Sequence, residues 1–288
     1  MKGIQNMTAN AYAKINIFLD ILGKLDNGYH SLFMVMQSVS LRDKITVIKR
    51  DDDKILIECD TPGVPCNEKN TAYKAAKYFF EEAKIKGGVT ISIEKNIPHE
   101  AGLAGGSADA AAVLKILNEI YETNFSDEKL CQIGLKVGSD VPFCIVGGTC
   151  LCQNTGGVIS KLPPLKECFV VLAKPEKGVS TPQAYADADS AYIYHPDCLR
   201  MLDCCEKGDF EGICKYAGNV FEQVVEVPER VEIKKIMGEN NCSLCQMSGS
   251  GPTVFGLFEK EEDANSAAEK IKNICKDVYV SKTIDKIF

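Results

Sequence analysis

Residues 94–111 read EKNIPHEAGLAGGSADAA, a glycine-rich stretch that lies between two regular segments. Over residues 89–94 apolar and polar side chains alternate, which is the pattern of a half-buried strand. From Ala110 to Tyr121 apolar residues recur at helical spacing. The polar face of that helix is expected to carry Asp109, Lys115, Asn118 and Glu119. The stretch therefore predicts a loop that leads from the end of a strand into the N-terminus of a helix.

A helix N-terminus favours an anion because its first backbone N–H groups have no intrahelical partner and the helix dipole is positive there. Gly102, Gly105 and Gly106 leave room for a phosphate to approach the main chain. We therefore interpret the loop as the binding site of a nucleoside triphosphate. A turn that only solves a packing problem is the alternative, and the glycines alone do not separate the two.

The loop is of neither common nucleotide-binding type. The chain contains no Gly-x-x-x-x-Gly-Lys-[Ser/Thr] sequence. The spacing after the predicted strand also differs from that of a dinucleotide-binding motif, in which an acidic residue follows about 20 positions on. A phosphate-binding role for residues 102–106 therefore requires a different class of nucleotide-binding protein.

The composition is that of a globular protein with a sizeable core. The chain has 288 residues, of which 45% are hydrophobic and 25% charged, and its formal net charge is −7. An acidic balance argues against nucleic acid or an anionic membrane as a partner, because both require a basic surface. The first seven residues lack an apolar signal core, and no run approaches the ~18 apolar residues of a membrane span. We expect a cytoplasmic protein.

Fourteen cysteines are scattered through apolar segments. Without a signal peptide, this distribution favours reduced core residues over a disulfide framework. Cys242 and Cys245 have the spacing of half a zinc site, but no second pair follows them. We expect no structural metal.

The rest of the chain reads as an α+β protein of two domains, 1–158 and 159–288. We place the boundary near 155–165, where the composition changes to paired glycines and paired prolines. The first domain is expected to hold strands at 8–22, 33–40, 44–50 and 54–59 and further helices at 71–86 and 126–137. The second is expected to hold strands at 168–173, 243–247, 253–258 and 277–284, short helices between 182 and 238, and a helix at 261–275. This order is that of a split βαβ, ferredoxin-like domain.

Three polar positions outside the loop are candidates for a cleft. Lys14 and Asn16 stand two apart on a predicted strand, so both point to one face, which is either a cleft or solvent. Asp140 stands between Gly138, which is placed to end a helix, and Pro142. It either faces the cleft or serves only as the N-cap of the next helix.

Taken together, the motifs resemble those of the GHMP kinases. Lys14 on an N-terminal strand, the Pro98–Ala111 loop and a second glycine-rich turn at Ser248–Gly251 occur in the order that this superfamily requires. The resemblance implies ATP and Mg²⁺, with an N-terminal domain like ribosomal protein S5 domain 2 and a ferredoxin-like C-terminal domain. It implies Lys14 and Asp140 as the catalytic pair. It assigns ATP binding to Lys95, Asn96, Pro98, Gly102, Leu103, Ala104, Gly105, Gly106, Ser107 and Ala108.

Three further segments, 13–19, 27–30 and 138–143, resemble one branch of these kinases, and the match spans nearly the whole chain. That branch phosphorylates the 2-hydroxyl of 4-diphosphocytidyl-2-C-methyl-D-erythritol in non-mevalonate isoprenoid synthesis. The resemblance implies that the small-molecule substrate contacts Asn16, Tyr29, His30, Tyr185, Gly249, Ser250 and Gly251, with the two tyrosines on opposite faces of the cytosine ring. Many members carry Ser-Ser where this chain has Ser107-Ala108, so Ser107 as a magnesium ligand stays open.

Two alternatives remain beside this interpretation. The chain could be another GHMP kinase, such as a homoserine or mevalonate kinase, although those substrates carry no base for Tyr29 and His30 to contact. It could also be a catalytically inactive nucleotide-binding module, against which the presence of both Lys14 and Asp140 argues. For the oligomeric state we expect a monomer or a weak homodimer.

Overall fold

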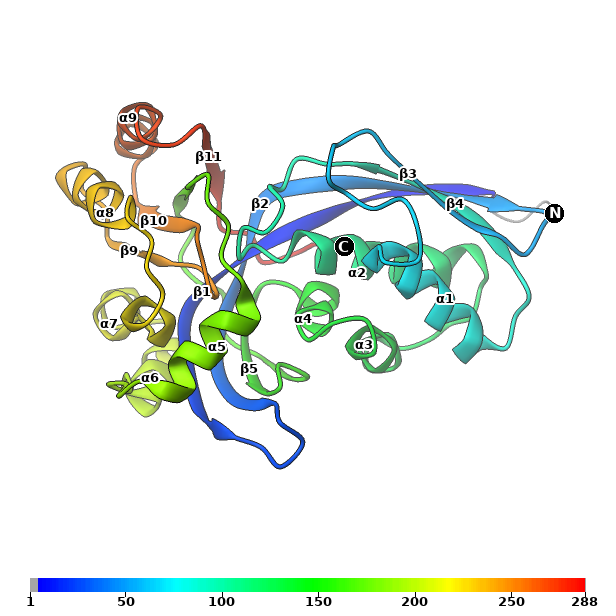
Figure 1. The fold of residues 1–288 in the computed structure, drawn as a ribbon, viewed down its shortest axis with the longest axis horizontal. Helices are drawn as coiled ribbons and strands as arrows, with labels where there is room; N and C mark the ends of the chain where they lie inside the picture. Colours follow the sequence, from blue (N-terminus) through cyan, green and yellow to red (C-terminus); the bar gives the residue numbers. More distant parts are fainter. Residues whose placement is uncertain (1–4, 288) are drawn as a thin grey trace.

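The structure is a computed structural model that describes residues 5–287. Its longest elements are two antiparallel strands, β1 (Asn6–Lys24) and β2 (His30–Arg50), which run through the first half of the molecule and reach the second (Figure 1). They belong to a seven-stranded sheet in the order β3-β4-β2-β1-β8, with β5 on β2 and β6 on β5. The remaining strands are β3 (Ile55–Cys59), β4 (Gly88–Glu94), β5 (Thr149–Asn154), β6 (Val158–Lys161) and β8 (Gly218–Asn219).

Four helices cover one face of this sheet (Figure 1). They are α1 (Thr71–Ala83), α2 (Gly105–Ile120), α3 (Asp127–Leu135) and α4 (Val141–Val146). The α2 helix is the central one, because its alanines and leucines are almost wholly buried between the sheet and its neighbours. Small side chains let a helix approach a sheet closely, so α2 packs directly against β1 and β2.

The second half contains a four-stranded antiparallel sheet in the order β11-β7-β10-β9. Its strands are β7 (Phe169–Lys174), β9 (Leu244–Met247), β10 (Val254–Phe258) and β11 (Asp277–Lys282), and α8 (Arg230–Glu239) and α9 (Glu261–Ile271) pack on it. The first and third strands in chain order lie at the centre, as in a ferredoxin-like fold, so this prediction is confirmed. Between β7 and α8 the chain adds α5 (Thr181–Ser190), α6 (Cys198–Lys207), α7 (Phe210–Tyr216) and the short 3₁₀ helix η1 (Val220–Gln223).

The observed strands differ in two places from those expected from the sequence. Segments 33–40 and 44–50 form one strand, because Arg42 and Asp43 between them pair in register with Tyr12 and Ala11 of β1. A bulge at residues 39–41 shifts the register, and the pairing with β1 resumes at Ser38 and Lys14. At this bulge Leu41 N–H donates to Ser281 Oγ over 2.9 Å, which ties the two sheets together. Strands β5 and β6 were not predicted, since the glycines at both ends made this segment read as a loop.

Both halves of the chain contribute to the first sheet. The expected boundary at 158/159 falls at the start of β6, which pairs with β5. From the second half, β8 returns to pair in parallel with Phe18 and Leu19 of β1. The boundary stays a prediction, but these pairings show that the halves share a continuous framework at the middle of the molecule.

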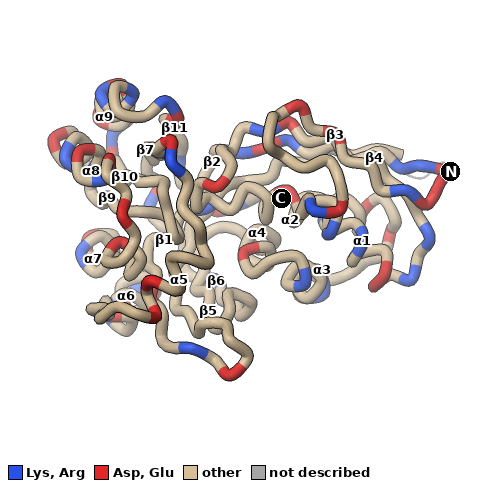
Figure 2. Tube along the Cα trace, viewed as in Figure 1, with Lys and Arg blue, Asp and Glu red and all other residues tan. Residues whose placement is uncertain are grey.

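Charged residues lie mainly on the outer elements. Basic and acidic positions are interspersed along α8 and α9 (Figure 2). Within residues 5–287, no helix is long and apolar enough to cross a membrane.

Candidate active site

A cavity of about 600 Å³ opens where the two halves of the molecule meet. The strand β1, the loop before α2, the start of α4, the start of α5 and the turn between β9 and β10 all contribute to its wall. These segments are far apart in the chain and converge because β1 extends from the first sheet to the second.

Lys14 is a buried side chain of this cavity with two short hydrogen bonds. It is only 3% exposed, and its Nζ donates to Asn16 Oδ1 over 2.7 Å and to the carbonyl oxygen of Gly102 over 2.8 Å. Asp140 Oδ2 lies 3.8 Å from the same nitrogen. Lys14 and Asn16 therefore share one face of the strand, as the sequence predicts, and this face lines the cavity and not bulk solvent.

Asp140 occupies the N-cap position of α4, yet its side chain makes no capping hydrogen bond. The carboxylate lines the cavity and its side chain is 32% exposed. The alternative in which Asp140 serves only as a cap is therefore wrong. A carboxylate held rigidly by a helix start, open to the cavity and beside a buried ammonium group, can accept a proton from a bound hydroxyl.

The glycine-rich loop leads into α2 as expected. Ala104 is the N-cap with φ +58°, and the helix begins at Gly105. At Gly102, φ is +72° and an added Cβ would lie 2.3 Å from the carbonyl oxygen of Ser248, so only glycine fits. Added Cβ atoms at Gly105 and Gly106 would instead meet Ile97 and Thr71 at 3.0 Å. These two glycines therefore solve a packing problem as well as leaving the helix N-terminus open.

The loop residues assigned to ATP differ in their surroundings. Seven of them line the cavity, namely Lys95, Pro98, Gly102, Ala104, Gly105, Gly106 and Ser107. Leu103 and Ala108 are buried in the core, where Leu103 accepts a backbone hydrogen bond from Lys14 N–H over 3.1 Å. The side chain of Asn96 points elsewhere and donates to the carbonyl oxygen of Arg42 over 3.1 Å.

Behind the loop lies a buried charge cluster of Lys95, Asp43 and Asp109. Lys95 Nζ contacts Asp43 Oδ2 at 2.5 Å and Asp109 Oδ2 at 2.8 Å. The expectation that Asp109 lies on the polar, outer face of the helix is wrong, because it is 3% exposed. Burial raises the pKa of Asp109 to about 8 against the opposing effect of Lys95. Its Oδ1 has no hydrogen-bond partner.

The second glycine-rich turn lies against the first. Ser248 Oγ donates to the Gly102 carbonyl oxygen over 3.0 Å, so this oxygen accepts from both Lys14 and Ser248. Gly249 and Ser250 line the cavity, and Ser250 Oγ lies 2.9 Å from Thr181 Oγ1 at the start of α5. Gly251, with φ +90°, packs its backbone on Met247 and is outside the cavity lining.

An aromatic group lies at the other end of the cavity, where Tyr185 and Phe221 line the wall. His30 is outside this lining and stacks on Tyr185. The rings of His30 and Tyr185 are stacked with centroids 4.6 Å apart, and Phe221 meets Tyr185 edge-on at 5.0 Å. His30 Nε2 also lies 2.6 Å from Asp189 Oδ1 on α5. Tyr29 is 66% exposed and is not part of the lining. The placing of a base between Tyr29 and Tyr185 therefore stays a prediction, in which Tyr185 is the better placed of the two.

Several residues of the site were not found from the sequence. Thr71, whose hydroxyl donates to the Gly106 carbonyl oxygen over 2.6 Å, and Phe221 both line the cavity. Only a helix N-terminus could have been recognised at Thr71, and nothing local marks Phe221. Among residues 5–287, no group of three or more His, Cys, Asp or Glu side chains is placed to hold a metal ion.

Comparison with known proteins agrees with this geometry. Residues 70–148 match the family model of the GHMP kinases N terminal domain, and residues 201–277 match that of the GHMP kinases C terminal domain. A homoserine kinase structure from Cytophaga hutchinsonii superposes with a TM-score of 0.79 at 19% identity, covering 99% of this chain and 97% of the other, which supports the fold alone. Fold and site thus define a GHMP kinase.

Closer relatives narrow the class. A curated 4-diphosphocytidyl-2-C-methyl-D-erythritol kinase from Clostridium botulinum is 44% identical over 96% of this chain and all of the relative, and one from Clostridium tetani is 44% identical over the same shares. A crystal structure of 4-(cytidine 5'-diphospho)-2C-methyl-D-erythritol kinase matches with a TM-score of 0.80 at 29% identity, covering 97% of this chain and all of the other. The chain belongs to this kinase family and is an ATP-dependent kinase of isoprenoid synthesis.

Membership in this family confirms the fold class and the enzyme class expected from the sequence. It sets aside the inactive nucleotide-binding module, since the relatives bear the names of enzymes. The roles of individual residues are a separate question, because a relative's name says nothing about them.

Proposed function

We propose that this enzyme transfers the γ-phosphoryl group of ATP to the 2-hydroxyl of 4-diphosphocytidyl-2-C-methyl-D-erythritol. The names of the relatives, at 42–45% identity, support the substrate. The observation that carries the chemistry is the Lys14–Asp140 pair, 3.8 Å apart, between the helix start at Gly105 and the turn at Ser248–Gly251.

Phosphoryl transfer requires positioning and charge stabilisation more than covalent catalysis. In the proposed mechanism Asp140 accepts or orients the proton of the attacking hydroxyl. Its carboxylate lines the cavity and makes no capping hydrogen bond to α4. Lys14 supplies a fixed positive charge beside the transferred group. Its contacts with Asn16 and Gly102 hold the ammonium group in place, so little reorganisation is needed when charge develops.

The triphosphate of ATP is proposed to lie on the Gly102–Ser107 loop. The first turn of α2 points its free backbone N–H groups at the cavity, and the dipole of this helix favours an anion there. Nothing in the loop replaces the lysine of a P-loop, because Lys95 is engaged with Asp43 and Asp109.

The residues present fit a magnesium ion that is held mainly by phosphates. Mg²⁺ in kinases commonly takes only one or two protein oxygens and keeps several waters. Asp140 and Ser107 both line the cavity beside the proposed phosphate site and offer such oxygens. Bound there, the ion would neutralise charge on the phosphate oxygens.

The cytidine end of the substrate is proposed to contact the aromatic group of His30, Tyr185 and Phe221. A base stacked on an aromatic ring gains about 1–3 kcal/mol. Stacking does not distinguish cytosine from uracil. We propose that hydrogen bonds from His30 and nearby backbone groups to the edge of the ring do so. Asn16, Gly249 and Ser250, which surround Lys14, are proposed to position the substrate alcohol.

A coupled assay of ADP release tests this proposal. We expect turnover with the cytidine substrate, and none above background with homoserine or mevalonate at equal concentration. Asp140→Asn in the same assay is the control that ties turnover to this cavity. Preferential phosphorylation of homoserine or mevalonate would contradict the proposed substrate.

A further inference from the structure

Two buried side-chain amides, Asn219 on β8 and Gln246 on β9, lie directly behind the wall of the cavity. They are 6% and 4% exposed, and neither is among the residues that line the cavity. Each donates both N–H groups to backbone carbonyl oxygens from a different segment of the chain. A buried amide with every N–H satisfied in this way fixes its partners firmly, because breaking one bond leaves an unpaired polar group.

Asn219 holds the second glycine-rich turn from behind. Its Nδ2 donates to the carbonyl oxygens of Met247 and Gly249, each over 2.8 Å, and these two residues flank Ser248. Its Oδ1 accepts from Phe221 N–H over 3.0 Å. Its own backbone pairs with Leu19 of β1. One side chain thus connects the turn to the strand that carries Lys14.

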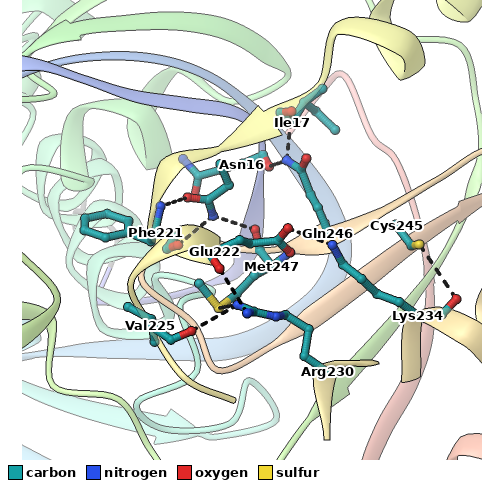
Figure 3. Close-up of polar contacts among 12 residues, drawn as sticks. Asn16, Ile17, Phe221, Glu222, Val225, Arg230, Lys234, Cys245, Gln246 and Met247 are labelled. Atoms are coloured by element: carbon teal, nitrogen blue, oxygen red, sulfur yellow. Dashed lines mark hydrogen bonds and ion pairs between the residues drawn. The ribbon is translucent and has the colours of Figure 1, made fainter. Parts of the chain in front are cut away.

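Gln246 makes the corresponding connection in the opposite direction. Its Nε2 donates to the carbonyl oxygens of Asn16 over 2.8 Å and Ile17 over 2.9 Å, which are 230 and 229 positions away in the chain (Figure 3). Asn16 is the residue whose side chain accepts from Lys14 Nζ. Gln246 therefore sets the position of the peptide groups that orient Lys14.

These contacts close a ring around the proposed transfer site. Lys14 and Ser248 both donate to the Gly102 carbonyl oxygen. The ring therefore runs by hydrogen bonds from Lys14 to Asn16 and Gln246, along the chain through Met247 to Ser248, and by hydrogen bonds through Gly102 back to Lys14. Three segments meet in it: the strand β1, the loop before α2, and the turn between β9 and β10. A shift of any one of these segments would therefore change the position of Lys14 relative to Gly102 or Ser248.

The supporting elements are themselves fixed. Glu222 of η1 accepts from Met247 N–H and pairs with Lys234 Nζ, each over 2.7 Å (Figure 3). Arg230 donates to the carbonyl oxygens of Glu222 and Val225 over 3.0 and 3.1 Å. The segments that carry Asn219 and Gln246 are therefore fixed by hydrogen bonds, so the two amides can hold the cavity wall in one position.

We propose that Asn219 and Gln246 are positioning residues for phosphoryl transfer, which act by holding the Ser248–Gly251 turn against β1 so that Lys14 keeps its place. The inference rests on the role proposed above for Lys14. It extends the site to two residues that touch neither substrate.

Asn219→Asp and Gln246→Glu test this with almost no change of shape. Each replaces an N–H donor by a carboxylate oxygen facing two carbonyl oxygens, which repels them. Misplacement of reacting groups by about 1 Å costs on the order of 100-fold. We expect kcat to fall about 10- to 100-fold in each variant, while KM for ATP stays within about threefold, because the loss is one of positioning.

The pH dependence of these variants separates positioning from a general weakening of the fold. A buried carboxyl with no positive partner titrates at raised pH, and its protonated form regains one donor. The ratio of variant to wild-type kcat should therefore rise as the pH falls from about 8.5 to 6. Circular dichroism at each pH establishes that equal amounts of folded enzyme are compared. A ratio that does not change with pH would overturn the proposal.

Asn240→Asp is the matched control. Asn240 is also 6% exposed and its Nδ2 also donates to a carbonyl oxygen, that of Ile236 over 2.7 Å, but it lies between α8 and α9, away from the cavity. It differs in one respect, because its Oδ1 accepts from Lys270 Nζ over 2.8 Å, so the control tests the loss of a buried amide donor beside a positive charge. We expect its kcat to stay within about twofold of wild type. An equal loss of kcat in this control and in Asn219→Asp would show that the loss comes from a less stable fold, and would overturn the proposal.

A double-mutant cycle completes the test. In a Lys14→Met background, measured by single-turnover kinetics, Gln246→Met should lower the rate less than about twofold further, although alone it lowers the rate about tenfold or more. Full additivity would show that Gln246 does not act through Lys14 and would overturn the inference. Wild-type activity of Lys14→Met itself would instead overturn the proposed function, so the two failures are distinguishable.

Discussion

The molecule contains two glycine-rich turns that touch each other and differ in nearly everything else. The first, Gly102–Ser107, leads into the sixteen-residue helix α2, so the N–H groups of its first turn have no backbone acceptor within the helix. The second, Ser248–Gly251, joins two strands and uses the N–H groups at both of its ends: Ser248 N donates to Thr253 O over 2.9 Å and Gly251 N to Ser248 O over 3.0 Å.

The supports behind the two turns differ as well. The first is backed by charge, the buried cluster of Lys95, Asp43 and Asp109. The second is backed by the neutral amides of Asn219 and Gln246. Glycine content is therefore no guide to role: a helix start offers an anion free donors and a dipole, whereas a turn between strands offers shape and a place for Ser248 and Ser250.

The largest expected effect is at the proposed catalytic pair, Lys14 and Asp140, which lies where the two turns meet. Asp140→Asn and Lys14→Met should each lower kcat by ~10²-fold or more, because proton acceptance and charge stabilisation are lost. Steady-state kinetics on folded protein measure this. Lys44→Met, which removes an exposed pair with Glu94, is the control for loss of a lysine. Retention of more than about a tenth of wild-type kcat in Asp140→Asn would show that the assigned role is wrong.

The next effect concerns the contact between the turns. Gly102→Ala places a methyl group against the Ser248 carbonyl oxygen, so one turn must move, and kcat/KM for ATP should fall about 10- to 100-fold. Gly208→Ala is a matched control, because φ there is +65° but nothing lies within 4 Å of the added carbon. It should cost about 1 kcal/mol of stability from backbone strain and leave kinetics unchanged. Equal kinetic losses in both variants would contradict a specific contact between the turns.

A third prediction sharpens the difference between the proposed phosphate end and the proposed base end of the cavity. Tyr185→Ala should raise KM for the cytidine substrate about tenfold to a hundredfold and leave KM for ATP nearly constant, because a stacking surface of about 1–3 kcal/mol is lost. Tyr29→Ala should have the smaller effect of the two, since Tyr29 is exposed and lies outside the lining. Tyr192→Ala, on the outer surface, serves as control. A normal KM for the cytidine substrate in Tyr185→Ala would remove this ring from the base site.

The smallest expected effect is on stability. It distinguishes the charged cluster behind the first turn from the neutral amides behind the second. The pKa of Asp109 is raised to about 8 by burial, so between pH 4 and 8 the folded protein holds a proton that the unfolded chain lacks. Its contribution to stability is therefore present at low pH and lost as the pH rises towards 8. Asp109→Asn removes this titration.

Urea unfolding at several pH values measures the effect. The free energy of unfolding of Asp109→Asn, relative to wild type, should rise by about 1 kcal/mol or more between pH 5.5 and 7.5. Asp203→Asn, at an exposed pair with Lys207, should show no such trend. A difference that shrinks with rising pH would contradict the raised pKa.

Much of the site was predictable because its signals are local. The strand, loop and helix of residues 88–120 follow from alternation, glycine and helical spacing within one short window. Lys14 and Asn16 share a face because side chains on a strand repeat every second residue. The ferredoxin-like sheet follows from the order of its elements, which allows few topologies.

What the sequence by itself determined is thus the strand, loop and helix around Gly102–Ser107 and the order of the elements. Only the tertiary structure decided which polar groups are buried. Asp109 looked like a surface residue because helical periodicity does not show that Lys95 and Asp43 lie opposite it. Asn219 and Gln246 carry no motif, and their partners are 28 to 230 positions away. A buried hydrogen bond between distant segments depends on how two sheets pack, and no local pattern records that.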